Sequence, residues 1–439
     1  MIPDRKLPEL KLYRGIETSF PLGSCPALGR LVVATSNENS PVHRWFRFKE
    51  GFSSDLLATV VRTLTPDLGG QIRLLDPFCG VGTTLLAAQE LAAEGLSISA
   101  IGIERNPFIA FVARTKVNWA GVVNLPELGR EALERAKELS PALPVLSSIR
   151  EGRCISQYMA RRIVAVREAI RSHGCDSSHD GLLLGLAASV ESVSRVRKDG
   201  RALRIVERDR TSLARALAGK WSMFAADVEA RRTLLHAPLV SQVVIGDGRN
   251  PSSAGVLPNS IDLILTSPPY PNNIDYNEVY KLELWLLGFV SDGEDFLRLR
   301  YSSFRSHPTC TAPDMPEEFE RELKRGALKQ LLGPLLTKAE ASPKRWRTRM
   351  LRGYFSDFWM ALREHYRCLR SGGYEVLVVG NSLHGGPDCP YLIPTDLAVS
   401  AMARCLGFSV EKTLVARALK RRLTGNHFLR ESLIVLKRP

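Results

Sequence analysis

The eight cysteines in this sequence of 439 residues form no Cys-x-x-Cys pair. Scattered single cysteines are typical of reduced thiols in a cytoplasmic protein rather than of a disulfide framework or a zinc module. His173, Cys175 and His179 have no second pair at ligand spacing, so we expect no metal site. No uncharged apolar run reaches the roughly 18 residues of a membrane span. The first residues, MIPDRKLPELKLYRG, lack the apolar region of a secretory signal.

The charge is unbalanced, with 60 Lys and Arg against 46 Asp and Glu, and the formal net charge is +14. An excess of this sign favours a polyanionic partner such as nucleic acid. Hydrophobic residues make up 44% and charged residues 24%, as in a globular protein. The length exceeds the roughly 250–300 residues that one core accommodates, so we expect a main domain with large insertions.

The hydrophobic pattern alternates between short apolar strands and amphipathic helices. Strand 72–76 precedes a helix at 84–94, and strand 97–104 precedes a helix at 108–119. This order is typical of a doubly wound α/β sheet with parallel strands. Further strands are expected at 241–247, 261–265, 374–382, 408–416 and 431–437, and further helices at 52–64, 355–369 and 394–406.

The pattern divides the chain into a core and two insertions. Residues 1–40 are expected to form an irregular N-terminal extension, because prolines punctuate them. The α/β core takes 41–120 and 240–439. Between them, 121–239 has helical periodicity and almost no strand pattern, which predicts a helical insertion domain. A second insertion is expected at 291–350.

The segment LLDPFCGVGTT (74–84) lies where a phosphate or nucleotide loop follows a strand. Gly80 and Gly82 allow the backbone to approach a ligand closely, although such a pair also occurs in purely structural turns. The segment lacks the Lys of a P-loop, which argues against binding of a nucleoside triphosphate. Glu104 ends the next strand about twenty residues on, where folds of this class bind ribose hydroxyls.

The segment TSPPY (266–270) directly follows the apolar strand IDLIL. Two prolines stiffen the backbone and remove two N–H donors, so the turn presents carbonyl acceptors. Ser267 adds a side-chain acceptor, and Tyr270 adds a flat aromatic face. The pattern suits a planar base with an exocyclic amine, but a simple strand-ending turn is the alternative.

Together, DPFCGVGTT, IGIERNP, GDG and TSPPY resemble the motifs of the S-adenosylmethionine-dependent amino-methyltransferases, which modify cytosine N4 or adenine N6 in DNA. The resemblance implies a Rossmann-like, seven-stranded methyltransferase sheet with an antiparallel last strand. It implies S-adenosylmethionine as cofactor, with the methionine part lined by Asp76, Phe78, Gly80, Gly82 and Thr83. It also implies that Glu104 binds the ribose, that Asn106 lies near the adenine and that Asp247 bonds the adenine amino group. Phe52 is a loose match to an upstream cofactor motif.

The same resemblance makes Ser267, Pro268, Pro269 and Tyr270 the catalytic tetrapeptide. If Ser267 and the Pro268 carbonyl accept the two N–H bonds of the amine, its lone pair can point at the methyl donor. Positioning of this kind contributes about 7–11 kcal/mol. Ser at the first place favours cytosine N4 over adenine N6, and RNA amino groups are a further alternative. No Pro-Cys dipeptide is present, so a cysteine-based C5-cytosine mechanism is not expected.

Basic residues cluster in three regions, and phosphate contacts with double-stranded DNA are the expected reason. In the insertion, Arg197, Arg201, Arg204 and Arg208 recur at the spacing of one helix face. A second cluster contains Lys344, Arg345, Arg347, Arg349 and Arg352. A third contains Lys420, Arg421 and Arg422, followed by Asn426 and His427, which can reach base edges.

No large domain follows the core, so target recognition is assigned to the helical insertion, to 291–350 or to a partner protein. For a methyl group to pass from the cofactor to the base, the two motifs must meet in space. The loop after strand 72–76 and the turn after strand 261–265 must face the same cleft.

Overall fold

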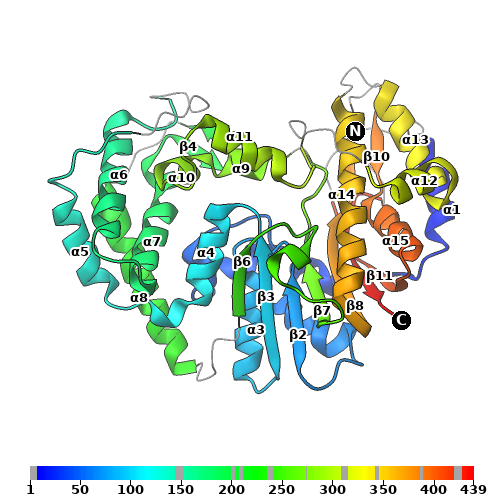
Figure 1. The fold of residues 1–439 in the computed structure, drawn as a ribbon, viewed down its shortest axis with the longest axis horizontal. Helices are drawn as coiled ribbons and strands as arrows, with labels where there is room; N and C mark the ends of the chain where they lie inside the picture. The colour runs from blue at the N-terminus through cyan, green and yellow to red at the C-terminus, as the bar shows by residue number, and fades with distance from the viewer. Residues whose placement is uncertain are drawn as a thin grey trace.

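A computed structural model of the protein describes residues 7–143, 153–198, 203–206, 211–234, 241–272, 274–307, 315–341, 346–385, 389–419 and 428–439. At its centre is an eight-stranded sheet in the order β1-β11-β12-β8-β7-β2-β3-β6 (Figure 1). The strands are β1 (Leu22–Ser24), β2 (Ile72–Asp76), β3 (Ile98–Glu104), β6 (Ser241–Ile245), β7 (Ile261–Thr266), β8 (Leu369–Gly380), β11 (Ser409–Ala418) and β12 (Arg430–Lys437).

The strand directions confirm the α/β fold. All neighbouring strands from β6 to β8 are parallel, whereas β12 is antiparallel to both β8 and β11. The sheet has one strand more than expected, because β1 pairs in parallel with β11. This strand is only three residues long and contains a glycine, so it leaves no hydrophobic alternation in the sequence.

The order of the sheet creates a switch point between β2 and β7. From β2 the chain moves outward to β3 and β6, and it then returns to the other side of β2 as β7. In open sheets of this class, ligands bind at the carboxyl ends of the strands at such a point. All six residues of β7 are buried, as expected for a central parallel strand.

Helices follow the strands as the periodicity predicts. Helix α3 (Thr83–Ala93) follows β2, and α4 (Pro107–Val117) follows β3. The helix expected at 52–64 forms as α2 (Asp55–Thr59) continued by one π-helical turn. Helix α15 (Thr395–Cys405) precedes β11.

The described residues of the insertion form four helices beside the β6 edge of the sheet (Figure 1). They are α5 (Leu125–Arg135), α6 (Gln157–Arg171), α7 (Ser177–Val193) and α8 (Leu213–Leu234). A small hairpin of β4 (Val196–Lys198) and β5 (Leu203–Ile205) lies between α7 and α8.

This hairpin corrects the prediction of an arginine-lined helix face. Arg197 in β4 lies directly opposite Arg204 in β5. Residues 199–202 and 207–210 lie outside the described part of the chain, so Arg201 and Arg208 have no described position. The overlooked signal was Asp199-Gly200, a dipeptide typical of hairpin turns.

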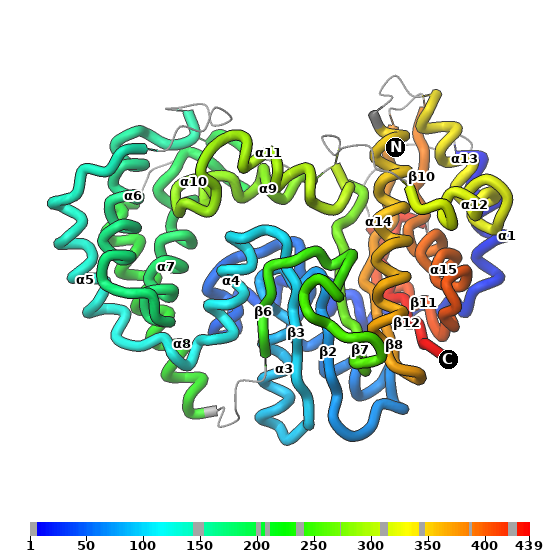
Figure 2. The backbone as a smooth tube through the Cα atoms, viewed as in Figure 1, coloured from blue at the N-terminus to red at the C-terminus, as the bar shows by residue number. Residues whose placement is uncertain are grey.

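The second insertion is largely helical. It contains α11 (Gly293–Ser302), α12 (Glu317–Arg325) and α13 (Ala327–Ala341), and it leads into the long α14 (Trp346–Cys368). In Figure 2, the short helices α9 (Tyr276–Val279) and α10 (Lys281–Leu286), together with α11, lie between the insertion helices and α14.

The extension expected at 1–40 is less irregular than predicted. It contains α1 (Glu9–Glu17) and β1, and α1 packs against α13 and α15 (Figure 1). A short hairpin of β9 (Ser382–His384) and β10 (Tyr391–Ile393) follows β8. None of the helices among the described residues is long and apolar enough to cross a membrane.

The insertion is clamped to the segment that leads into the cleft. Asp227 on α8 accepts the backbone N–H of Val42 at 3.1 Å, the Trp45 indole N–H at 3.1 Å and the Arg44 guanidinium. Val42 has a φ of 66°, and the His43 N–H bonds the Pro41 carbonyl at 2.8 Å. Such a turn is strained for a β-branched residue. These three contacts of Asp227, here called the Asp227 clamp, therefore stabilise the strained turn at Val42 that precedes residues 46–52.

Candidate active site

The segments that follow β2, β3, β6 and β7 surround one cleft of about 1280 Å³. Residues 76–81, 83 and 84 line it, and residues 267–270 line it as well. Both segments leave the sheet at the same edge, because β2 and β7 are parallel neighbours. The expectation that the two motifs face one cleft is confirmed.

Asp76, the last residue of β2, connects the two motifs. Its buried carboxylate accepts the Thr84 hydroxyl at 2.6 Å, the Thr266 hydroxyl at 2.7 Å and the Phe78 backbone N–H at 3.2 Å. Burial raises the pKa of Asp76 to about 6, although these hydrogen bonds act against the rise. Thr266 is the last residue of β7, so its hydroxyl fixes the start of the Ser-Pro-Pro-Tyr turn against β2.

Glu104 ends β3 and holds the loop after β2. Its carboxylate accepts the Gly80 backbone N–H at 3.1 Å and the Asn106 backbone N–H at 2.8 Å, one on each oxygen. Burial raises the pKa of Glu104 to about 7, and the charge of Asp76 adds to the rise. A carboxylate can accept about four hydrogen bonds, so Glu104 retains acceptor capacity at the cleft that it lines.

The two glycines of the loop have different surroundings. Both adopt left-handed backbone angles, with φ of 51° at Gly80 and 81° at Gly82. Gly80 lines the cleft, whereas Gly82 is not among the lining residues. Instead, Gly82 precedes α3, and an added Cβ would lie 3.2 Å from the Cβ of Ala113. Gly82 therefore shapes the turn, while its neighbour Thr83 lines the cleft.

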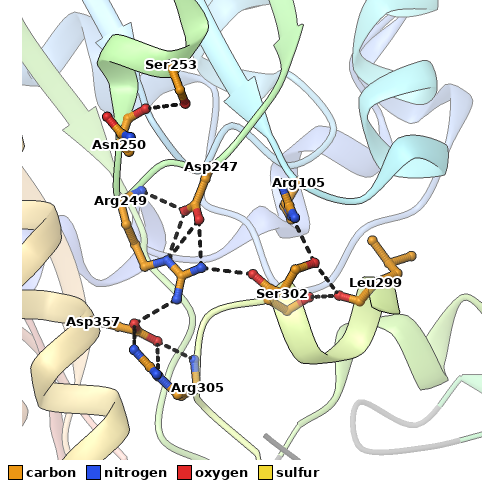
Figure 3. Close-up of polar contacts among 10 residues, drawn as sticks. Arg105, Asp247, Arg249, Asn250, Ser253, Leu299, Ser302, Arg305 and Asp357 are labelled. Atoms are coloured by element: carbon orange, nitrogen blue, oxygen red, sulfur yellow. Dashed lines mark hydrogen bonds and ion pairs between the residues drawn. The ribbon is translucent and has the colours of Figure 1, made fainter. Parts of the chain in front are cut away.

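Asp247 lies in the cleft wall after β6 and is strongly bound by Arg249 (Figure 3). The guanidinium donates from Nη2 at 2.6 Å and from Nε at 2.9 Å, and the Arg249 backbone N–H donates at 3.0 Å. Burial alone would raise the pKa of Asp247, but Arg249 outweighs it and holds the pKa below its usual value. Asp247 was predicted to accept a hydrogen bond from the adenine amino group, but Arg249 occupies most of its acceptor positions.

Arg249 extends this network to the second insertion and to α14 (Figure 3). It donates to buried Asp357 at 2.7 Å and to the Ser302 carbonyl at 2.9 Å. Arg305 also pairs with Asp357, and Arg105 donates to the Ser302 hydroxyl at 3.1 Å. The network fixes the end of α11 beside Asp247.

Residues 267–270 form the opposite wall of the cleft. The Tyr270 ring packs against Gly380 of β8, where an added Cβ would lie 2.7 Å from Tyr270 Cε2. Burial raises the pKa of Tyr270 well above its usual value, while the Ser267 side chain acts against the rise, so the Tyr270 hydroxyl is neutral. The turn therefore brings the neutral Tyr270 hydroxyl and the Ser267 hydroxyl to the same wall of the cleft.

The other predicted cofactor residues also line the cleft. They are Phe52, Phe78 and Asn106. Asn106 caps α4: its Oδ1 accepts the backbone N–H groups of Phe108 and Ile109, and its Nδ2 donates to Asn277 at 2.9 Å. One amide hydrogen of Asn106 remains beyond these bonds.

The predicted DNA-binding residues are only partly placed. Arg197 and Arg204 are exposed on the β4–β5 hairpin. Lys198 anchors this hairpin, because it binds Glu283 at 2.5 Å and its Nζ lies 4.5 Å from the centre of the Tyr280 ring. The residues Lys420, Arg421, Arg422, Asn426 and His427 lie outside the described residues.

The cleft also contains ionisable residues that the motifs did not indicate. Glu50, two residues before Phe52, accepts the Tyr280 hydroxyl at 3.2 Å, and burial raises its pKa. His307 and Arg347 reach the cleft from the second insertion and α14. Arg417 and Glu431 reach it from β11 and β12. Arg417 and Glu431 are neighbours because of the register in which β11 pairs with β12. Sequence periodicity predicts the strands but not this register.

Cys79 lines the cleft as a small buried residue, and burial raises the pKa of its thiol well above the usual value. Its thiol is therefore protonated and poorly nucleophilic. Among the described residues, no group of three His, Cys, Asp or Glu side chains is arranged to hold a metal ion.

No protein-family model matches the chain. It is 27% identical to the type II methyltransferase M.AvaI of a Nostoc species, covering 94% of this chain and 90% of that protein. Over nearly its full length, the chain is similar to type II methyltransferases. It is also 26% identical to the type II methyltransferase M.BsoBI of Geobacillus stearothermophilus, covering 93% and 88%. Among solved structures, the match to the rRNA methyltransferase aviRa of Streptomyces viridochromogenes covers 92% of each chain at 13% identity, with a TM-score of 0.30.

Proposed function

We propose that the protein is an S-adenosylmethionine-dependent methyltransferase that modifies the exocyclic N4 amine of cytosine in double-stranded DNA. One observation carries this proposal: the loop after β2 and the Ser-Pro-Pro-Tyr turn line the same cleft. The hydrogen bond from Thr266 to Asp76 joins the strand ends from which these two segments start. The similarity to type II methyltransferases over 94% of the chain supports it.

The residues of the loop side fit the cofactor. S-adenosylmethionine combines a sulfonium methyl donor with a ribose diol and an adenine, and it supplies the methyl group when bound. The Glu104 carboxylate lines the cleft and can accept further hydrogen bonds, which suits the ribose hydroxyls. Asp76, Phe78, Gly80 and Thr83 surround the adjoining part of the cleft, and Phe52 closes it from the N-terminal segment. Asp247 retains a smaller role, because Arg249 holds its carboxylate.

The residues of the turn side fit the target amine. Ser267 Oγ and the Pro268 carbonyl accept the two N–H bonds of the amine, so its nitrogen becomes pyramidal and its lone pair faces the loop side. Methyl transfer would form one N–C bond as the S–C bond of the sulfonium breaks, which leaves a neutral thioether. The positively charged nitrogen would then release one proton to solvent by way of its hydrogen bond to Ser267. Pro269 keeps the backbone stiff during this step. Tyr270 stacks on the base and contributes about 1–3 kcal/mol toward holding it outside the duplex.

The protein's charge fits the proposed substrate. The net charge is +14, and Arg197 and Arg204 project from a hairpin that is anchored beside the cleft through Lys198. We propose that this hairpin contacts DNA phosphates and that the insertion 121–239 carries target recognition, with help from 291–350.

The test is the chemical identity of the product. Purified protein is incubated with methyl-labelled S-adenosylmethionine and duplex DNA or structured RNA, and the nucleosides are separated by mass spectrometry. N4-methylcytosine in DNA is the expected product. N6-methyladenine would reverse the choice of base, label confined to RNA would reverse the choice of polymer, and no label in either would contradict the proposal.

A further inference from the structure

Three strands place a row of residues next to the Ser-Pro-Pro-Tyr turn. Gly380 of β8 lies opposite Glu431 of β12, and Glu431 lies opposite Arg417 of β11. Residues directly opposite in antiparallel pairs project from the same face of a sheet. Because the Tyr270 ring occupies the space above Gly380, the Glu431 and Arg417 side chains lie on the same face as this ring.

Arg417 is aimed by an irregularity in its strand. The pairing of β11 with β12 shifts register between Val415 and Arg417. Bulges of this kind redirect side chains and are common beside active sites. The largely buried Glu431 carboxylate accepts the Arg417 Nε–H at 2.5 Å, while 40% of the Arg417 side chain remains exposed.

The pair is close enough to Tyr270 to influence it. The negative charge of Glu431 contributes to the raised pKa of the Tyr270 hydroxyl, and the positive charge of Arg417 opposes it. Tyr270, Arg417 and Glu431 all line the cleft. A base against Tyr270 therefore shares the cleft with the Arg417 guanidinium. Glu431 accepts only the Nε–H of Arg417, so it leaves the four Nη hydrogens for other acceptors.

The two candidate bases present different edges to such a donor. Beside its N4 amine, cytosine carries two adjacent acceptors, N3 and O2. Beside its N6 amine, adenine carries the acceptor N1 and then a C2–H group. A guanidinium is a rigid fork of parallel N–H donors and pairs best with two adjacent acceptors. Arg417 therefore matches the cytosine edge at both positions and the adenine edge at one.

We propose that Arg417 reads the flipped base by donating its Nη hydrogens to N3 and O2 of cytosine, and that Glu431 is a positioning residue for this guanidinium. This inference rests on the proposed function and specifies which base its site selects. It adds a base-reading group from the last two strands to the Ser-Pro-Pro-Tyr turn.

The experiment pairs a protein change with a substrate change. The methylated position is first mapped with the wild-type protein, and that base is then replaced by 3-deazacytosine, which lacks the N3 acceptor. We expect kcat/KM of the wild type to fall about tenfold or more on the analogue, the usual effect of leaving a site donor unpaired. Arg417→Lys should show a similar loss on cytosine and less than twofold further loss on the analogue.

Two further variants separate base reading from other effects. Glu431→Gln should give a smaller loss, because it leaves Arg417 present but less firmly held. Lys412→Ala removes an exposed charge from the same strand and should leave both substrates unchanged. The affinity for S-adenosylmethionine should be equal in all variants.

The outcomes distinguish this inference from the proposed function. If the product is N4-methylcytosine but the losses of kcat/KM from Arg417→Lys and from the analogue are fully additive, the proposed role of Arg417 is overturned and the proposed function stands. Equal rates of the wild type on cytosine and 3-deazacytosine would do the same, even if the variants fail to fold. N6-methyladenine as the wild-type product would overturn both.

Discussion

The Thr266 hydroxyl donates to the Asp76 carboxylate at 2.7 Å, although 190 residues separate the two in the chain. Each residue ends its strand, and the two strands are parallel neighbours at the switch point of the sheet. This bond sets the distance between the loop proposed to hold the cofactor and the turn proposed to hold the base. In the proposed function, the geometry of methyl transfer thus depends on a hydrogen bond within the protein, between the ends of two strands.

Thr266→Val should therefore impair catalysis more than its effect on stability suggests. Loss of a hydrogen bond to a buried carboxylate costs about 1.5–3 kcal/mol in unfolding free energy. Thr84→Val is the matched control, because Thr84 donates to the same carboxylate at 2.6 Å but lies in α3 directly after the loop. Denaturant unfolding should show similar losses for both variants, whereas single-turnover methyl transfer should fall further in Thr266→Val. Equal transfer rates would contradict the bridging role.

The titration of Glu104 should appear in the pH dependence of stability. Burial raises its pKa from the usual 4.5 to about 7. Between these values, the unfolded chain has lost a proton that the folded protein still binds, so unfolding free energy falls as pH rises. The contribution is up to about 1.4 kcal/mol per pH unit. Glu104→Gln should show a correspondingly flatter profile between pH 5 and 7 in denaturant titrations, and an unchanged slope would count against this environment.

The arginine pair of the β4–β5 hairpin should act on DNA binding and not on folding. Arg197 and Arg204 lie opposite each other, and like charges in this arrangement do not stabilise a hairpin. Replacing both with Ala should reduce the slope of log affinity against log salt by about 1.8, the value for two lost phosphate contacts. Arg62→Ala, which removes an exposed arginine paired with Glu94, is the control. A salt slope equal to that of the wild type would remove the hairpin from the DNA interface.

The Asp227 clamp should matter for both stability and cofactor affinity. Asp227→Ala leaves the strained turn at Val42 and the Arg44 charge without their common partner, so unfolding free energy should drop by about 3 kcal/mol or more. The next residues carry Phe48 and Phe52 into the cleft, so affinity for S-adenosylmethionine should fall as well. Asp227→Asn keeps one acceptor oxygen and should restore part of both losses. Calorimetric titration that shows wild-type affinity in the Ala variant would refute the link to the cleft.

The strands and helices of the core were predictable because each carries a clear local pattern. Residues 72–76 and 261–266 are short apolar runs between turn signals, and both form central strands. The position of Asp76, Glu104 and Ser267 at strand ends was enough to place them at one edge of a parallel sheet. The relation between the two motifs therefore followed from topology.

The missed features depend on contacts between distant segments. Strand β1 exists only because β11 offers it an edge, and the Arg417–Glu431 pair exists only in the register of β11 with β12. Arg197 and Arg204 have helical spacing as well as hairpin spacing, so their periodicity alone does not distinguish a helix face from a hairpin. The bond of Asp247 to Arg249 is local, yet the link of Arg249 to Asp357 spans 108 residues.

The central claim is that one cleft holds the methyl donor on the loop side and the base on the turn side. It is tested most directly by Tyr270→Ala in single-turnover methyl transfer to duplex DNA, with cofactor affinity measured on the same preparation. We expect the transfer rate to fall about tenfold or more through lost stacking, while the affinity for S-adenosylmethionine changes less than twofold. An unchanged transfer rate, or an equal loss of cofactor affinity, would contradict the account.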